Sequence, residues 1–425
     1  MKLLLKNGRV LDPATDMDAK MDLLIEDDTI LMRKENMDEK EADEVIDVSG
    51  CYVTPGLIDL HVHLREPGFE HKGTIETETK AMAKGGFTTV CPMPNTKPAT
   101  DCAEMVWKVL DKAKEVSPIH VLPVGAITIG EIGEERTDLA AMKEAGIVAI
   151  SEDGRSVMNA KLYEEAMKEA ARLGLVVLAH CEDRDLVGHG CMNLGEKSRE
   201  FGVEGISNAV EDVIVARDIL LAKETGVRLH LCHCSTRDSV KMIQFAKENG
   251  VDVTGEVCPH HFTLSTDDMV APDPQFKMNP PLREKEDVEA LKAGLGDGIM
   301  DVISTDHAPH AKEEKNQPID KAPFGIIGSE TAVALTMTEL VKPGILTPME
   351  MVRKMSYNPA QILGIDKGSL AEGKIADITV INPDEEWTIT EEDTISKGKN
   401  TPFYGRKVFG RVKYTIVDGQ VVYRD

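Results

Sequence analysis

The stretch Gly56-Leu57-Ile58-Asp59-Leu60-His61-Val62-His63 decides the fold, because it is an apolar, β-prone run that ends in two histidines. Side chains alternate between the faces of a strand, so His61 and His63 project in the same direction and their imidazole nitrogens can share one cation. A second such run ends late in the chain, at Ser304-Thr305-Asp306-His307-Ala308-Pro309-His310. We interpret the two runs as the first and last strands of a metal-binding barrel.

Between these runs the sequence alternates strand-like and helical segments at the spacing of a parallel βα array. The candidate strands are residues 52–61, 88–93, 120–125, 147–151, 176–180, 229–233, 252–257 and 302–306. Helical composition is found at residues 75–84, 102–115, 160–173, 210–225 and 239–249. Eight βα units over residues 53–365 predict an α/β fold, a (β/α)8 TIM-type barrel. A doubly wound open sheet is the alternative, but no Gly-x-Gly-x-x-Gly phosphate loop follows the first strand.

Both ends of the chain have the alternating pattern of short antiparallel strands. The first segment covers residues 1–52, and the second covers residues 366–425, where Asp418-Gly419 predicts a hairpin turn. We expect the two segments to form one small composite β-sandwich domain beside the barrel.

The bulk composition argues against several kinds of partner. The 425 residues include 49 Lys and Arg against 74 Asp and Glu, a formal net charge of −25, which disfavours nucleic acid and anionic membrane surfaces. The apolar run Leu3-Leu4-Leu5 is too short for a signal peptide or a membrane span. Eight cysteines without a regular disulfide ladder are typical of reduced thiols. We therefore expect a cytoplasmic protein that acts on a small molecule.

Residue types that bind metals recur where the predicted strands end. They are His61, His63, Asp153, His180, His233 and Asp306, and Asn95 lies just beyond the second strand. Barrel enzymes place their chemistry at the C-terminal ends of the strands, so we expect these side chains at one rim. Four histidines and two carboxylates suit two divalent cations better than one, with zinc as the first expectation. The alternative is a set of structural polar residues.

The chain resembles the amidohydrolase superfamily, and within it the bacterial dihydroorotases, over its whole length. The most specific motifs are Asp59–Gly68 (DLHVHLREPG), Met93–Pro98 (MPNTKP), Asn279–Arg283 (NPPLR) and Asp306–His310 (DHAPH). The resemblance implies reversible hydrolysis of a cyclic amide at a two-zinc centre, interconverting dihydroorotate and N-carbamoyl-aspartate. It also implies that His61, His63 and Asp306 bind one zinc and that His180 and His233 bind the other.

One departure from the superfamily pattern concerns the group that bridges the metals. Many members use a carboxylated lysine at the fourth strand, but the segment Ala149-Ile150-Ser151-Glu152-Asp153-Gly154 has no lysine. In the branch that this chain resembles an aspartate takes that place, which makes Asp153 the expected bridge. Glu152 is the neighbouring alternative, although strand alternation puts it on the other face. The missing lysine argues against a hydantoinase, a dihydropyrimidinase or an allantoinase.

The catalytic step requires a nucleophile and a carrier for a proton. Water shared by two zinc ions is acidified towards neutrality, and one metal can polarise the carbonyl that is attacked. The amide nitrogen leaves as a neutral group only if it receives a proton, and Asp306 beside the water can take up and deliver that proton. In the alternative interpretation, Asp306 is a metal ligand only.

The carboxylate of the substrate requires a cation. Arg65 follows His63 by two residues and lies on the same face if the extended geometry persists, and its guanidinium matches a carboxylate with two parallel hydrogen bonds. The resemblance adds Asn95, Asn279 and His310 as further substrate contacts. A surface position for Arg65 and a turn position for Asn95 are the alternatives.

The polar segment 311–322 follows the last predicted strand and is bounded by Pro309 and Pro323. We expect a helix-poor lid that excludes water from the site and brings contacts near Phe324 and Gly325. A disordered surface loop is the alternative.

Several neighbouring residues are expected to have supporting roles. Asp59 shares a face with His61 and is expected to orient a ligand. His230 is expected to point outward, because only His233 lies in the family pattern His-x-Ser-Thr. The pair at 260–261 is expected to support or pack against the site rather than bind metal.

The leading hypothesis is thus a zinc-dependent dihydroorotase, and another cyclic amidohydrolase is the alternative within the same class. A non-catalytic scaffold that supports aspartate carbamoyltransferase is the alternative from a different class, but scaffolds of that kind lose metal histidines that this chain keeps. Association with aspartate carbamoyltransferase and formation of a homo-oligomer are both compatible with the sequence.

Overall fold

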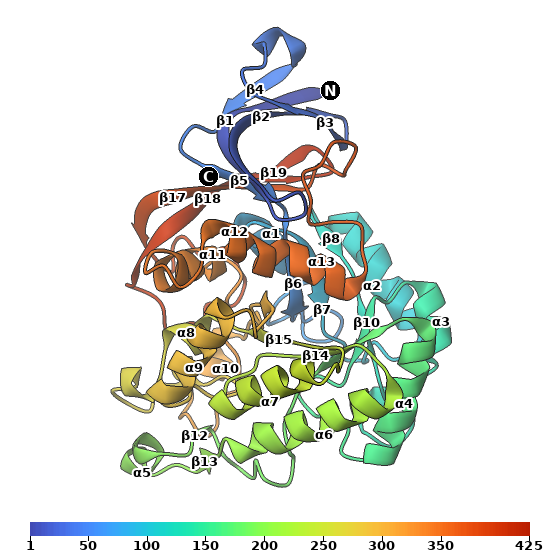
Figure 1. Ribbon diagram of the computed structural model, residues 1–425. Coiled ribbons are helices and arrows are strands. Elements are labelled where there is room, and N and C mark those ends of the chain that lie inside the picture. The colour runs from blue at the N-terminus through green and yellow to red at the C-terminus, as the bar shows by residue number, and fades with distance from the viewer.

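Parallel strands at eight positions form a closed barrel in the computed structural model, which describes residues 1–425 (Figure 1). The strands are β6 (Leu57–Val62), β7 (Phe87–Pro92), β8 (His120–Val121) with β9 (Val124–Ala126), β10 (Ala149–Ser151), β11 (Val176–Ala179), β14 (Leu229–Leu231), β15 (Val253–Val257) and β16 (Val302–Ile303). Because β8 and β9 follow each other across Leu122 and Pro123, they occupy one position. The ring closes between its first and last strands, where His63 N donates to His307 O at 2.8 Å. The predicted barrel is confirmed, and the open sheet is not.

The five predicted helices are present with bounds within two residues of the predicted ones. They are α1 (Ile75–Lys84), α2 (Ala103–Val116), α4 (Ala160–Leu173), α6 (Ala209–Thr225) and α7 (Arg237–Glu248). Their ends follow from capping residues: the Thr74 hydroxyl accepts from Thr77 N at 3.1 Å before α1, and Gly174 ends α4 at a φ of 69°. No helix is both long and apolar enough to cross a lipid bilayer.

Further helices and two short strands connect the barrel units. They are α3 (Leu139–Ala145), β12 (Met192–Asn193), α5 (Glu196–Phe201), β13 (Gly205–Ile206), α8 (Pro259–Thr263), α9 (Lys285–Gly296), α10 (Lys312–Lys315), α11 (Ala332–Thr336), α12 (Pro348–Val352) and α13 (Asn358–Leu363). The strands β12 and β13 pair with each other in parallel and form a separate two-stranded sheet.

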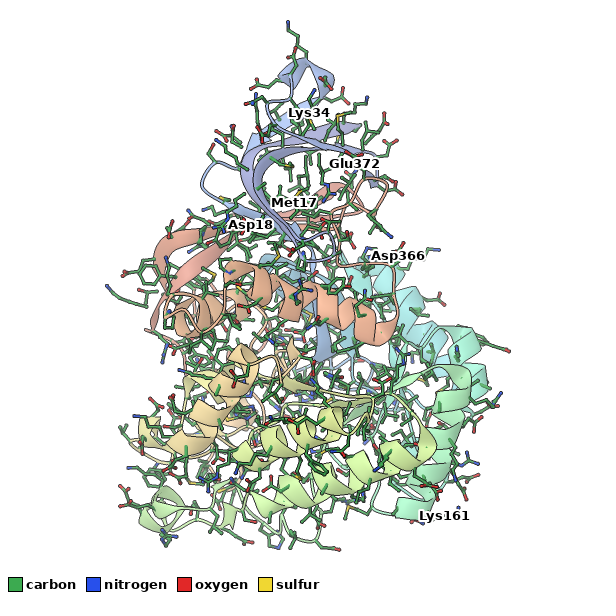
Figure 2. All side chains as sticks on the ribbon, viewed as in Figure 1. Met17, Asp18, Lys34, Lys161, Asp366 and Glu372 are labelled. Atoms are coloured by element: carbon green, nitrogen blue, oxygen red, sulfur yellow. The ribbon has the colours of Figure 1, made fainter.

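Strands from both ends of the chain share one sheet at the top of Figure 1. They are β1 (Lys2–Asp12), β2 (Met17–Glu26), β3 (Thr29–Lys34), β4 (Glu44–Asp47), β5 (Tyr52–Pro55), β17 (Ile378–Thr388), β18 (Lys407–Val417) and β19 (Gln420–Arg424). Leu5, Val53, Ile378 and Ile416 belong to one buried apolar cluster, so the two chain ends share a core. In Figure 2, Lys34 and Glu372 lie at the same end of the molecule, where Arg33 N donates to a Glu372 carboxylate at 3.0 Å.

The predicted strand 52–61 is wrong in one respect, because it is two strands. Val53 of β5 pairs with Val10 and with Val380 in the terminal sheet, whereas β6 belongs to the barrel. Gly56 divides them and lies so close to the next strand that a Cβ atom there would stand 2.1 Å from the Thr88 hydroxyl oxygen. Both halves are apolar and extended, so their hydrophobic pattern does not reveal that they enter different sheets.

Candidate functional site

His61, His63 and Asp306 come together where the first and last barrel strands end. The His63 Nε2 atom lies 3.0 Å from Asp306 Oδ1, and the His61 Nε2 atom lies 3.5 Å from the same oxygen. All three side chains are buried. Because Asp306 adopts a φ of 47°, its backbone leaves the strand direction and turns the carboxylate towards the two imidazoles.

Asp153 lies between this group and a second pair of histidines. Its Oδ1 is 3.3 Å from His61 Nε2 and 3.5 Å from His180 Nδ1, and its Oδ2 is 3.6 Å from His63 Nε2. His180 Nδ1 in turn lies 2.8 Å from His233 Nε2. Glu152 instead accepts a hydrogen bond from Thr128 N at 3.0 Å, so the geometry favours Asp153 over Glu152 as the group between the two sets.

The donor atoms of this cluster fit a metal. His61 Nε2, His180 Nε2 and Asp153 Oδ1 are buried and have no hydrogen-bond partner within the protein. Buried polar atoms without partners are rare and indicate an ion or water that belongs at the site. Imidazole nitrogens and carboxylate oxygens are ligands that zinc prefers. The family-type ligand set predicted from sequence is therefore assembled at one rim of the barrel.

Neighbouring charges and burial shift the pKa values of the side chains in this cluster. Burial alone would lower the pKa of His180, but the Asp153 and Glu182 carboxylates outweigh it and raise that pKa to about 10. Burial and the neighbouring His180 and His61 lower the pKa of His233 to about 3. Burial opposes ionisation of Asp306, yet His61 and His63 hold its pKa down at about 2. His180 thus carries a proton that a metal would displace on binding.

Acceptor groups fix His61 in β6 and His63 just after it, with Nε2 of each ring facing the cluster. His63 Nδ1 lies 3.0 Å from Asn95 Oδ1, and His61 Nδ1 lies 3.0 Å from Glu256 Oε1. Because each acceptor takes the Nδ1 proton, Nε2 keeps its lone pair for a metal. Asn95 also donates to Asp153 Oδ2 at 2.8 Å, so it contacts metal-binding residues as well as the cavity.

Asp59 connects the first and last strands beneath this cluster. Its Oδ1 accepts from His61 N at 3.2 Å and from Thr305 N at 3.1 Å, and its Oδ2 accepts from the Thr305 hydroxyl at 2.6 Å. Burial raises the pKa of Asp59 to about 7, although these hydrogen bonds oppose the shift. The carboxyl group therefore holds the backbone of a metal-binding histidine in register with the residue that precedes Asp306.

His230 does not point outward as the sequence indicated. It is fully buried, and its Nε2 lies 3.0 Å from Glu256 Oε2. The prediction failed because β14 ends at Leu231 and His233 has a φ of 33°, so the chain turns and both histidines face inward. Two functional residues, Glu256 and Glu182, were missed, and Glu256 was detectable as a lone acidic residue inside an apolar strand run.

A cavity of about 550 Å³ opens beside the cluster. Arg65, Asn95, Asn279, Phe324 and Gly325 line it, together with five of the six candidate metal ligands: His63, Asp153, His180, His233 and Asp306. Arg65 has left the extended conformation, with a φ of 66°, but its guanidinium still lies at the cavity, and burial lowers its pKa to about 10. Asn279 donates to Glu182. His310 lies behind the lining, 3.3 Å from Arg65 Nη2, and donates to Phe324 O at 2.7 Å.

The segment 311–322 contains a helical turn, α10, so the helix-poor prediction is wrong in part. Lys315 of α10 is buried, and its ammonium donates to the carbonyls of Lys277, Pro323 and Gly325 at 2.9–3.0 Å. Burial lowers the pKa of Lys315 to about 7. These contacts attach the segment to the cavity wall at Gly325, and its closure as a lid stays a prediction.

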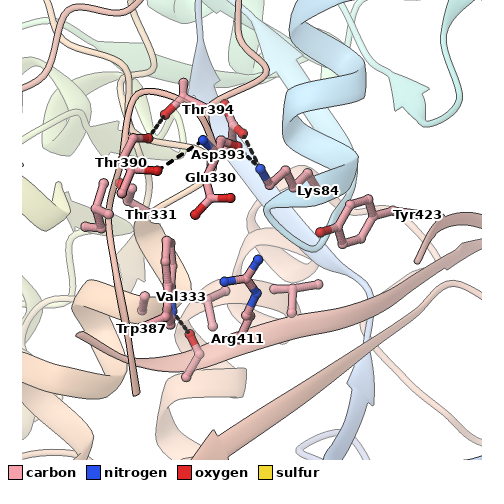
Figure 3. Close-up of a pocket in the computed structure, with 14 residues that line it drawn as sticks. Lys84, Glu330, Thr331, Val333, Trp387, Thr390, Asp393, Thr394, Arg411 and Tyr423 are labelled. Carbon is pink, nitrogen blue, oxygen red and sulfur yellow. Dashed lines mark hydrogen bonds and ion pairs between the residues drawn. The ribbon is translucent and has the colours of Figure 1, made fainter. Parts of the chain in front are cut away.

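Two other features lie outside this cluster. Cys258, His260 and His261 form a buried group of potential ligands, in which His261 Nε2 donates to Pro280 O at 2.9 Å. A second cavity, of about 470 Å³, lies between α1 and the terminal strands (Figure 3). Its charged groups already have partners: Lys84 lies 3.4 Å from Glu330, and Arg411 stacks over Trp387. None of the predicted site residues lines it.

Comparisons with known proteins cover the whole chain. A family model described as dihydro-orotase-like matches residues 50–239, and an amidohydrolase family model matches residues 287–423. A dihydroorotase of Bacillus cereus strain AH820 is 49% identical over 424 residues, covering 100% of this chain and 99% of the relative. A dihydroorotase of Pelotomaculum thermopropionicum is 50% identical over 425 residues, with the same coverage.

Solved structures of lower identity share the fold. An L-hydantoinase (dihydropyrimidinase) from Arthrobacter aurescens has a TM-score of 0.90 at 26% identity and covers 99% of this chain and 96% of its own. A dihydropyrimidinase from Brevibacillus agri NCHU1002 has a TM-score of 0.87 at 25% identity and covers 100% of this chain and 95% of its own. The barrel and the terminal sandwich are therefore both common to these hydrolases.

Removal of divalent metal is expected to lower the melting temperature. A metal that binds only the folded chain at one hundred times its dissociation constant stabilises it by about 2.7 kcal/mol. Calorimetry before and after dialysis against a chelator measures the loss. Added Zn²⁺ should restore the transition and Mg²⁺, which prefers oxygen ligands, should not. Identical transitions in all four samples would contradict a metal at this cluster.

Lys315→Met is expected to expose the segment 311–325 to proteases, because three carbonyls lose their charged donor at about 1 kcal/mol or more each. Lys312→Met is the matched control, since Lys312 lies on the same helical turn and is exposed. Limited proteolysis followed by mass spectrometry measures cleavage between α10 and Gly325. Equal cleavage rates in both variants would show that Lys315 does not hold the segment.

Proposed function

The chain belongs to the dihydroorotase family of amidohydrolases, and from this premise we propose that its rim cluster interconverts dihydroorotate and N-carbamoyl-aspartate with two bound zinc ions. The observation that carries the proposal is the convergence of four histidines and two aspartates beside a half-buried arginine. As a member of this metal-dependent family, the chain is a cyclic amide hydrolase. The specific substrate, the zinc and the number of ions are the proposed part.

The six ligands divide into two sets. His61, His63 and Asp306 would hold one zinc, His180 and His233 would hold the other, and Asp153 would bridge them. Asp153 supports this division, because it lies within 3.6 Å of a nitrogen from each set. When bound, the metals supply an acidified water and polarise the ring carbonyl.

Asp306 is proposed to carry the proton. Because its pKa is held at about 2, the carboxylate is ionised at neutral pH and can accept a proton from the attacking water. Water adds to the ring carbonyl carbon, the bond from that carbon to the ring nitrogen breaks, and Asp306 returns the proton to the departing nitrogen. The products are the carbamoyl amide and a new carboxylic acid, which releases its remaining proton to solvent at neutral pH, and the reverse sequence closes the ring.

The opposite side of the cavity is proposed to bind the carboxylate of the substrate. Arg65 offers the charged donor, with Asn95 and His310 beside it, and Asn279 is proposed to contact the ring amide. Phe324 and Gly325 would form the wall against the ring. In a chain with a net charge of −25, a local cation is required to attract an anion into the site.

A hydantoinase-like activity is the second candidate, since the hydantoinase and dihydropyrimidinase structures have the same fold. The absence of a lysine beside Asp153 and the 49–50% identity to dihydroorotases favour the first candidate. A cytoplasmic location, a homo-oligomer and association with aspartate carbamoyltransferase stay predictions, and co-elution from a sizing column would test the association.

Zinc-loaded protein is expected to hydrolyse dihydroorotate, and the ring opening is followed by ultraviolet absorbance. Hydantoin and allantoin are the matched substrates, because both are cyclic amides without the ring carboxylate that Arg65 would bind. Turnover of either compound in the absence of dihydroorotate turnover would overturn the proposal.

Asp306→Asn is expected to lower kcat by orders of magnitude while the chain keeps its fold, because the amide cannot take up the proton. Circular dichroism checks the fold, and initial rates with saturating zinc separate catalysis from metal loss. A wild-type kcat in this variant would remove Asp306 from proton transfer.

Arg65→Met is expected chiefly to raise KM, because the contact with the carboxylate is made equally in the ground state and the transition state. Methionine keeps the apolar stem and removes the charge. Initial rates over a range of dihydroorotate concentrations give kcat and KM separately. A variant with unchanged KM would place the carboxylate elsewhere.

A further inference from the structure

A buried acidic residue lies directly beneath the metal-binding histidines. Glu256 of β15 has no exposed surface, and its Oε1 receives two contacts of 3.0 Å, from His61 Nδ1 and from the backbone N of His233. His61 and His233 belong to different metal sets in the proposed division. One carboxylate oxygen therefore contacts a residue of each set.

The contact with His61 has a chemical consequence. A carboxylate oxygen is only an acceptor, so the His61 Nδ1 atom must carry the proton and Nε2 must carry the lone pair. His61 Nε2 is the buried atom that faces Asp153 without a hydrogen-bond partner. Glu256 thus selects the tautomer in which His61 can bind a metal, and its negative charge makes the imidazole a stronger ligand.

His230 holds the other oxygen of this carboxylate. Its Nε2 lies 3.0 Å from Glu256 Oε2, and its Nδ1 lies 2.8 Å from the Thr254 hydroxyl. A carboxylate oxygen is only an acceptor, so His230 Nε2 carries a proton and donates it to Glu256 Oε2. His230 thus occupies Oε2 and leaves Oε1 to His61 and to the backbone N of His233.

We propose that Glu256 and His230 are positioning residues that together set the metal affinity of the rim cluster, Glu256 by fixing and polarising His61 and His230 by holding the Glu256 carboxylate in place. The inference rests on the proposed function only in that a metal occupies the cluster. It involves neither the substrate nor the proton transfer at Asp306.

Loss of the pair's contacts is expected to weaken metal binding. Glu256→Gln keeps the shape and removes the charge, so the metal dissociation constant should rise by about 10- to 100-fold, as for other partners of metal-binding histidines. His230→Leu removes the donor to Glu256 Oε2 and should also raise the constant, whereas His230→Gln keeps a donor and should stay closer to the wild-type value. A role of His230 in packing alone would give the same constant in His230→Leu and His230→Gln.

Zn²⁺ dissociation constants measured by competition with a chromophoric chelator test the inference, with no substrate present. Asp12→Asn is the matched control, because Asp12 is an equally buried carboxylate in the terminal sheet, paired with Arg33 at 2.9 Å. This control should lose thermal stability and keep the wild-type affinity. In Glu256→Gln, excess zinc should restore most of kcat.

Three results would overturn the inference. A wild-type dissociation constant in Glu256→Gln removes the positioning role of Glu256. Equal dissociation constants in His230→Leu and His230→Gln remove the positioning role of His230. A similar loss of affinity in Asp12→Asn makes the effect one of general stability. If the protein hydrolysed a different cyclic amide, the order of the Zn²⁺ dissociation constants among the variants would be unchanged. Failure of the proposed function is therefore distinguishable from failure of this inference.

Discussion

The close approach of buried imidazole nitrogens and carboxylate oxygens is the constraint on which the rest of the site depends. His180 and His233 approach to 2.8 Å, and Asp153 and Asp306 face imidazole nitrogens at 3.0–3.6 Å. Without a cation, such a set is stable only if protons are shared among its members, which explains why the pKa values of His180 and His233 move in opposite directions. A bound metal would resolve these repulsions together, and it would couple folding to metal binding at this rim.

The backbone at the rim adopts conformations that are rare for residues other than glycine. Arg65, His233 and Asp306 have positive φ values of 66°, 33° and 47°. Such residues cost about 1–3 kcal/mol each and persist only where their surroundings enforce them. The support is visible in two carboxylates: Asp59 holds the backbone before Asp306, and Glu256 holds the backbone N of His233. The buried layer beneath the metals therefore also maintains the geometry of the rim.

Sequence reasoning found what depends on local pattern. The rim residues were found because each follows an apolar strand run, and helices such as α1 and α4 were found because their periodicity and caps lie within the helix itself. The Gly56 boundary was missed, because which sheet a strand joins depends on Val10 and Val380, far along the chain. His230 was misassigned for a related reason: its partner Glu256 lies on the next strand, and the residues around His230 do not reveal that contact.

The cavity brings carboxylates and cationic groups together, and this charge distribution would orient the anionic substrate that we propose. Asp153 and Asp306 line the cavity with Arg65, which has His310 and Lys72 behind it. His310 donates from Nε2 to Phe324 O, so its Nδ1 keeps the lone pair and accepts from Lys72 at 3.4 Å. Burial and the neighbouring Arg65 and Lys72 lower the pKa of His310, which keeps the ring neutral between two cations. A neutral ring between them lets these two positive charges lie close together, and a substrate carboxylate bound at Arg65 would be attracted by both.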